Sequence, residues 1–191
     1  MRKVILLVLI FSSVSSASII EWSTDTGGNG HLYEAVAAQP GISWTQARNA
    51  AELAGGYLVT LTSQAENDFV FGLVDNDIYW YHGINLRGPW IGGFQPQGSP
   101  EPDGNWQWVT GESFDFQNWN IGQPNEFNWN NENSIHLGNQ ATRTSDWNDV
   151  PADFAEIQSY VIEYVPEPTT LLLLGLGGLI LQKKRRRLVK I

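Results

Sequence analysis

The sequence predicts an α+β fold in which two helices pack on short antiparallel strands, together with a long loop region. Two stretches with helical periodicity lie before residue 75, and short apolar segments follow later in the chain. A polar stretch from Thr110 to Asn133, with almost no aliphatic residue, lies between them. Helices and strands that segregate in this way are typical of α+β folds rather than of alternating βαβ units. A loop of this length is uncommon without a function.

The two expected helices are defined by their caps. The first begins after Ser43, where Gln46 completes a capping box, and it ends at the Gly55-Gly56 pair. The residues expected on its apolar face are Trp44, Ala47, Ala51 and Ala54. Ser63 and Glu66 open the second helix in the same manner. The residues expected to point inward from it are Phe69, Val70 and Leu73.

The expected strands are short and bounded by turn residues. They are His31–Ala37, 57–61, Trp90–Gly93, Trp106–Val109, Ser134–Leu137, a segment around Trp147–Asp149, and Ser159–Tyr164. Gly92 and Gly93, at the end of the expected strand Trp90–Gly93, mark a place where another backbone can approach closely.

Residues 1–17 are predicted to be a secretory signal peptide. They combine a basic start, eight apolar residues from Val4 to Phe11, and small residues that end in Ala17. This order is typical of a signal peptide that is cleaved after Ala17, and so short an apolar run cannot span a bilayer. Residues 18–29 are interpreted as a lead-in segment, since they end in a Gly/Asn turn cluster.

Residues 165–191 form a tail with a pattern of their own. Val165-Pro166-Glu167-Pro168 precedes an apolar run from Leu171 to Leu181, and basic residues follow from Lys183 to Arg187. As a helix the apolar run rises about 16 Å, roughly half of a hydrocarbon core, and the basic cluster should stay in the cytoplasm. The pattern resembles the PEP-CTERM sorting signal, which implies transient membrane insertion and processing by an exosortase-type enzyme in a bacterium that makes extracellular polysaccharide. An ordinary short C-terminal anchor is the alternative.

The two ends together predict an exported protein at the cell surface or outside the cell, with its tail at the inner membrane before processing. The exported part, 18–164, has three arginines against nineteen acids, a net charge of −16. Such a charge argues against nucleic acid and anionic membranes as partners and favours cations. The chain has no cysteine, so disulfides and thiolate chemistry are excluded.

The polar loop gathers side-chain oxygens. Gln123, Asn125 and Glu132 offer amide and carboxylate oxygens, and Asn148 with Asp149 repeats the combination further along. Calcium takes six to eight oxygen ligands, so these five side chains leave positions that neighbouring hydroxyls of a sugar could fill. A solvated Asn-rich turn has the same composition, and both interpretations stay open at this point.

Several motifs resemble, in order and spacing, those of the C-type lectin-like domain over about residues 30–164. They are Trp44-x-x-Ala47, Gly55-Gly56-x-Leu58, Trp90-Ile91-Gly92, Trp106-x-Trp108, Trp119, Gln123-Pro124-Asn125, Glu132-Asn133 and Trp147-Asn148-Asp149. In that family an E-P-N or Q-P-D triplet, a later glutamate and a W-N-D pair hold a sugar-binding calcium. The resemblance therefore implies calcium as cofactor and a carbohydrate or exopolysaccharide as partner. The implied ligands, which also contact the sugar, are Gln123, Asn125, Glu132, Asn148 and Asp149.

Two aromatic residues of the loop are candidates for sugar contact. Phe127 lies where galactose-binding relatives often place a stacking aromatic, and Trp129 is close by; plain loop packing is the alternative. The tryptophans expected in the core instead are Trp44, Trp90, Trp106, Trp108 and Trp147.

This sequence departs from the family in two respects. The conserved disulfides would fall at Ala51 with Ile162 and at Ser134 with Ala152, and none of these is cysteine. Each missing bridge forgoes roughly 2–4 kcal/mol. The triplet Gln-Pro-Asn at Gln123 is neither of the family's two forms, so it does not name the sugar. It also lacks a carboxylate, which should weaken a calcium site.

No catalytic machinery is expected, so the protein is predicted not to be an enzyme. The acids Glu101, Asp103, Glu112 and Asp115 are not arranged as an opposed pair, and His31, His82 and His136 lack metal-ligand spacing. A second calcium site at acids such as Asp103 or Glu126 stays open. The favoured function is an exported, calcium-dependent carbohydrate-binding protein. The alternative is a structural or protein-binding matrix component on the same fold.

Overall fold

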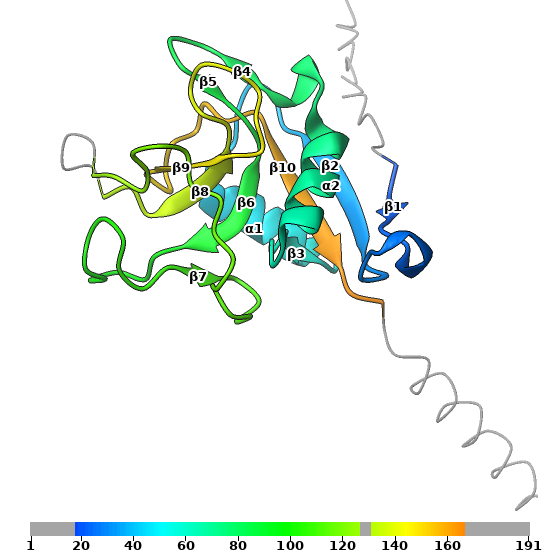
Figure 1. Ribbon diagram of the computed structural model, residues 1–191. Coiled ribbons are helices and arrows are strands. Elements are labelled where there is room, and N and C mark those ends of the chain that lie inside the picture. Colours follow the sequence, from blue (N-terminus) through cyan, green and yellow to red (C-terminus); the bar gives the residue numbers. More distant parts are fainter. Residues whose placement is uncertain (1–17, 127–130, 167–191) are drawn as a thin grey trace, which may run out of the picture.

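The computed structural model describes residues 18–126 and 131–166, which form an α+β domain around an eight-stranded sheet (Figure 1). In order across the sheet, the main strands are β1 (Ile20–Glu21), β2 (Leu32–Ala37), β10 (Ser159–Tyr164), β6 (Trp90–Phe94), β8 (Ser134–Leu137) and β9 (Trp147–Val150). Two further strands join beside this path, β3 (Tyr57–Leu58) against β10 and β7 (Gln107–Trp108) against β6. A separate hairpin is made of β4 (Tyr81–His82) and β5 (Leu86–Arg87).

The first and last long strands are neighbours. β2 and β10 pair antiparallel from Ala37 with Ser159 to Leu32 with Tyr164. On its other side β10 runs parallel to β6, with Tyr160 opposite Trp90. The expected antiparallel arrangement therefore holds for every pair of the described strands except this one, where the last strand is inserted between two earlier ones.

Both helices begin where their caps predicted. α1 (Trp44–Leu53) starts with a complete capping box between Ser43 and Gln46, and α2 (Gln64–Val74) starts with Ser63 accepting from the backbone N–H of Glu66. The Glu66 carboxylate accepts from the backbone N–H and the hydroxyl of Thr62 rather than from the backbone N–H of Ser63. The second helix therefore has the N-cap bond but not the complete capping box.

β2 begins one residue later, and β6 ends one residue later, than expected. Three further boundaries were wrong. α1 ends at Leu53, so Ala54 is its exposed C-cap rather than part of the apolar face. The strand expected over 57–61 keeps its ladder only at β3, and the one expected over 106–109 only at β7. The remaining residues of both segments are buried or half-buried without ladder pairing, which periodicity alone cannot distinguish from a strand.

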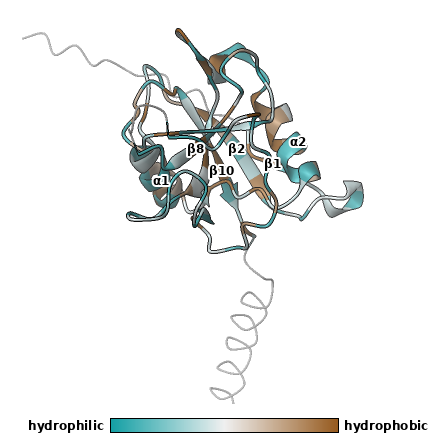
Figure 2. Ribbon diagram, turned by 60° about the vertical axis from the view of Figure 1, so that its left-hand side comes forward, coloured by the Kyte–Doolittle hydropathy of each residue, from teal (hydrophilic) through white to brown (hydrophobic). Residues whose placement is uncertain are grey.

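Alternation along the central strands builds a separate core on each side of the sheet. Ile91 and Val161 point into one cluster, which α2 covers through Val70. Their neighbours Trp90 and Ile162 point into the other, which α1 covers. Successive side chains of a strand face opposite sides, and α1 and α2 accordingly lie on opposite sides of β2, β8 and β10 (Figure 2).

A cluster of aromatic rings holds the long polar loop against the sheet. The five tryptophans expected in the core are buried, with at most 7% of each exposed. Rings of the loop pack on Trp147 at centroid distances of 6.0 Å for Phe114, 5.6 Å for Phe116 and 5.7 Å for Trp119. Two backbone hydrogen bonds also join the loop to Trp147. The Trp147 N–H donates to the Asn118 carbonyl, and the Trp147 carbonyl accepts from the Asn120 N–H. The segment that leads to Gln123 is therefore docked beside β9.

Other contacts occupy the places where the resemblance put disulfides. Ala51 and Ile162 are both buried in the α1-side core. At the second place, Asn133 Oδ1 accepts the backbone N–H of Ala152 at 3.0 Å. Apolar packing and one amide bridge thus join the segments that the family links covalently.

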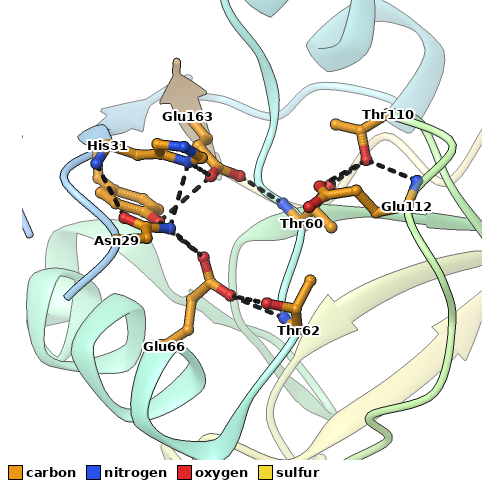
Figure 3. A network of polar contacts seen from close by, with 9 residues as sticks. Asn29, His31, Thr60, Thr62, Glu66, Thr110, Glu112 and Glu163 are labelled. Carbon is orange, nitrogen blue, oxygen red and sulfur yellow. Dashed lines mark hydrogen bonds and ion pairs between the residues drawn. The ribbon is translucent and has the colours of Figure 1, made fainter. Parts of the chain in front are cut away.

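Two buried carboxylates tie the N-terminal segment to α2 and β10 (Figure 3). Glu163 accepts from His31 Nδ1 at 2.6 Å, and Glu66 accepts from Asn29 Nδ2 at 3.1 Å. The Tyr33 hydroxyl links them, donating to Glu66 at 2.7 Å. Burial raises the pKa of Glu163, while the bond from His31 opposes that rise. Residues of the expected lead-in segment are therefore bonded into the domain.

Candidate metal and carbohydrate site

Four of the five candidate ligands are brought together by β9 and the docked loop. Asn148 and Asp149 lie on β9, whose partner β8 places His136 opposite Asn148. The loop presents Asn125 to Asp149: the backbone N–H of Asn125 lies 3.2 Å and 3.0 Å from the two Asp149 carboxylate oxygens. Gln123 joins through Asn125, whose Nδ2 donates to Gln123 Oε1 at 2.5 Å.

Asp149 is a buried carboxylate with little compensation. Only 1% of the residue is exposed. Burial raises its pKa from 3.8 to about 8, the N–H of Asn125 opposes this, and the negative charges of Glu132 and Glu101 raise it further. Burial disfavours the charged form unless an opposite charge is near. A cation placed here would supply that charge.

The amide of Asn148 is bonded on both sides. Its Oδ1 accepts from Gln140 Nε2 at 2.7 Å, and its Nδ2 donates to the Asp149 carbonyl at 2.7 Å. Nδ2 also lies 3.2 Å from His136 Nε2. Complete burial lowers the pKa of His136 to about 3, so this imidazole is neutral.

Glu132, the fifth candidate, is buried just before β8 and acts electrostatically on Asp149 and on Arg87. Burial lowers the pKa of Arg87, and the charges of Glu156, Tyr81 and Glu132 oppose this. The guanidinium lies over the ring of Phe154 at 4.2 Å. The positive charge of Arg87 on β5 thus interacts electrostatically with Glu132 and with His136.

The possible second site has an acidic neighbourhood. Partial burial and the charge of Glu126 raise the pKa of Glu101. Asp103, the other acid considered, is exposed. Within 18–126 and 131–166, however, no group of three or more His, Cys, Asp or Glu side chains is arranged to hold a metal ion.

The donor set of the five candidates suits a hard cation. It combines two carboxylates with three amides, which is the oxygen mixture that calcium accepts, and it contains no sulfur or imidazole ligand for softer metals. N–H donors bond Gln123 Oε1, Asn148 Oδ1 and the Asp149 carboxylate. A bound cation would therefore share or replace these hydrogen bonds.

Two of the sugar-contact candidates, Phe127 and Trp129, lie outside the described residues. An open hollow of about 810 Å³ lies between the β4–β5 hairpin and the segment before β9. Gln140 lines it, but none of the five candidate ligands does. The hollow is therefore a neighbour of the candidate site and not part of it.

Comparison with known proteins identifies the family. The family model for the lectin C-type domain matches residues 41–156, which include all five candidate ligands. The chain belongs to the C-type lectin domain family. The model for the PEP-CTERM protein-sorting motif matches residues 165–187. This C-type lectin domain is therefore exported, with a C-terminal tail of the kind that exosortases process.

Relatives of this C-type lectin domain are binding proteins, and no catalytic family is indicated. Lectin BRA-3 of Megabalanus rosa is 30% identical over 151 residues, which cover 78% of this chain and 82% of BRA-3. A perlucin-like protein of Mytilus galloprovincialis is 31% identical over 111 residues, 58% of this chain and 63% of that protein. The chain thus spans a little under two thirds of the perlucin-like protein.

Solved structures share the fold of this C-type lectin domain. The carbohydrate-recognition domain of cow CD23, determined in the presence of a GlcNAc2Man3 oligosaccharide, has a TM-score of 0.55 and 25% identity. The match covers 72% of this chain and 90% of that one. Among the described residues, no helix is long and apolar enough to cross a membrane.

Sequence reasoning missed three residues that surround the candidate ligands. They are His136, Gln140 and Arg87. In the sequence His136 is only an isolated histidine, and neither of the others lies in a recognisable motif. Their proximity depends on the register of β8 with β9 and on a bridge between Leu86 and Gln140. A single sequence contains no local signal for either.

Proposed function

We propose that this protein is an exported, calcium-dependent carbohydrate-binding protein of the bacterial cell surface or extracellular matrix. Its partner is a carbohydrate or exopolysaccharide, and it has no catalytic activity of its own. The proposed ligands of the ion, which also bond the sugar, are Gln123, Asn125, Glu132, Asn148 and Asp149. Phe127 and Trp129 are proposed to contact the sugar ring.

The observation that supports this proposal most is the state of Asp149. Its carboxylate is buried next to the charge of Glu132, and its pKa is raised to about 8. Hydrogen bonds connect the candidate ligands to Asp149: the Asn125 backbone N–H donates to its carboxylate and the Asn148 NH₂ group to its carbonyl, and Gln123 Oε1 accepts from Asn125. A divalent cation would offset the buried charge and, when bound, would offer open coordination positions to sugar hydroxyls.

Thermal unfolding in chelator and then in millimolar calcium tests the ion. Calcium at 100 times its dissociation constant should stabilise the protein by about 2.7 kcal/mol, which corresponds to a rise of several degrees. A glycan array with and without calcium then tests the sugar. We expect Asp149→Ala and Glu132→Ala each to abolish calcium-dependent sugar binding while the fold survives in chelator.

The matched control is Asp153→Ala, because Asp153 is exposed and lies outside the proposed ligand set. This variant should bind calcium and sugar as the wild type does. Calcium-dependent sugar binding that persisted in both ligand variants would refute the proposal.

A second candidate function is a structural or protein-binding matrix component on the same fold. It is supported by the hydrogen bonds that already satisfy Gln123 Oε1 and Asn148 Oδ1 without an ion. The lack of a carboxylate at residue 123 also favours it. A blank glycan array in calcium, beside the capture of one specific matrix protein, would decide for this function.

The place of the protein in the cell follows from the tail. We propose that residues 165–191 insert transiently in the inner membrane and are then processed by an exosortase-type enzyme. Deleting the tail should release the domain to the medium, which fractionation with an antibody to the domain would show.

A further inference from the structure

The orientation of the Asn148 amide matters because its two ends have nearly the same shape but opposite character. The oxygen accepts hydrogen bonds and can bind a cation, whereas the NH₂ group only donates. A half-turn of the amide would place the NH₂ group where the oxygen had been, and a cation would be repelled there. The structure must therefore select one of two orientations that packing alone barely distinguishes.

Hydrogen bonds select that orientation. Asn148 Nδ2 lies 2.7 Å from the carbonyl oxygen of Asp149, which can only accept, so the NH₂ group belongs on this side. The oxygen then faces Gln140 Nε2, a donor, at 2.7 Å. The third contact, 3.2 Å from Nδ2 to His136 Nε2, requires a lone pair on that imidazole nitrogen.

The backbone of β8 provides that lone pair. His136 Nδ1 lies 2.7 Å from the carbonyl oxygen of Leu137, so Nδ1 carries the proton of the ring. Nε2 of the same tautomer is then an acceptor that faces Asn148. The ring is fully buried and stands edge-on to Trp90 at a centroid distance of 6.2 Å, which holds its plane.

We propose that His136 is a positioning residue of the candidate calcium site. Its Nε2 accepts from the NH₂ group of Asn148 and keeps that group toward β8, so that Oδ1 points toward Gln140. The lone pair of Oδ1 that Gln140 does not use is the one that this amide can offer to a cation. This inference rests on the proposed function. Groups behind a metal ligand commonly set its orientation, and their loss weakens metal affinity by about 10- to 100-fold.

Two substitutions separate this role from simple packing. His136→Phe keeps an aromatic ring against Trp90 but removes the lone pair and the Nδ1 proton. His136→Gln removes the ring but can direct an amide oxygen at Asn148 Nδ2. Positioning predicts that the Phe variant is the one impaired in calcium binding, whereas packing predicts that the Gln variant is.

The experiment is calorimetric titration of calcium alone into the wild type and both variants, with unfolding temperatures in chelator recorded for each. We expect His136→Phe to weaken calcium binding about 10- to 100-fold and His136→Gln to retain most of the wild-type affinity. Wild-type affinity in the Phe variant would overturn the inference, and so would an equal loss in both variants. A wild type that binds no calcium would instead overturn the proposed function, and this inference with it.

A measurement on the wild type keeps the inference testable if His136→Phe does not fold. The ¹⁵N chemical shifts of the His136 ring report which nitrogen bears the proton. We expect the Nδ1–H tautomer both in chelator and in calcium. The Nε2–H tautomer in either condition would overturn the inference, since that nitrogen could not then accept from Asn148.

Discussion

Replacing Asp149 by asparagine should stabilise the calcium-free protein, although Asp149 is a proposed ligand. The residue is 1% exposed and its pKa is raised from 3.8 to about 8. Each pKa unit is worth about 1.4 kcal/mol, and at pH 7 Asp149 is ionised in the unfolded chain but mostly protonated in the folded one. The proton taken up on folding therefore lowers the free energy of unfolding at pH 7 by about 4 kcal/mol. In the variant an NH₂ group replaces one of the two oxygens that face the Asn125 N–H, and a poorly paired buried N–H costs about 1–3 kcal/mol. The net gain should be about 1–3 kcal/mol, the difference between these two effects.

The sign of the pH dependence follows from the same shift. A carboxyl whose pKa is higher in the folded state stabilises the fold below its unfolded pKa and loses that contribution as the pH rises through the folded value. The wild type in chelator should therefore lose stability between about pH 4 and pH 8. The free energy of unfolding of Asp149→Asn should not show this decrease with pH, because the variant has no carboxyl to titrate at this position.

Calorimetry or circular dichroism in chelator measures the effect. At about 2–4 °C per kcal/mol, Asp149→Asn should unfold roughly 2–12 °C above the wild type at pH 7. Calcium should raise the unfolding temperature of the wild type and not that of the variant. Asp153→Asn, at an exposed position, is the control and should change neither. A lower unfolding temperature for Asp149→Asn in chelator would refute the reasoning.

Three further predictions concern the ion, the missing disulfide and the aromatic cluster. Gln123→Glu restores a carboxylate to the triplet and should tighten calcium binding in calorimetric titration; unchanged affinity would remove residue 123 from the ligand set. Cysteines at both Ala51 and Ile162 should form a disulfide and raise stability by up to about 4–5 kcal/mol for so long a loop, measured by unfolding with and without reductant. Trp147→Ala should lower the free energy of unfolding by about 3–5 kcal/mol in urea titration and weaken calcium binding as well, because Trp147 holds the loop against β9.

The helices and the strands β8 and β10 could be predicted because their sequence signals are local. Ser43 with Gln46 and the two glycines that follow α1 act within a few residues, and β8 and β10 were expected at their observed bounds. The side-chain alternation of a strand involves consecutive residues, so it can be recognised in the sequence itself. The family motifs and the C-terminal sorting signal were likewise readable, and the matches to the two family models confirm them.

The ends of helices and strands, and the pairing of distant strands, were predicted less well. Ala54 fitted the helical period but lies outside α1, and the ladder of β3 stops after Leu58. The parallel pairing of β10 with β6 has no signal of its own in either strand. Such features depend on contacts between segments that are distant in sequence, and packing over the whole domain determines those contacts.

The candidate ligands could be named from motif spacing, but their chemical state could not. The raised pKa of Asp149 depends on burial and on acids far away in sequence, and its bond from Asn125 joins residues 24 positions apart. The contact of His136 with Asn148 exists only because β8 and β9 pair in one register. The resemblance of the chain's motifs to known families therefore indicated the family and the sorting signal, and composition indicated the oxygen-rich loop. Burial and strand register, which are properties of the folded chain, decided which charges lack compensation and which way each amide points.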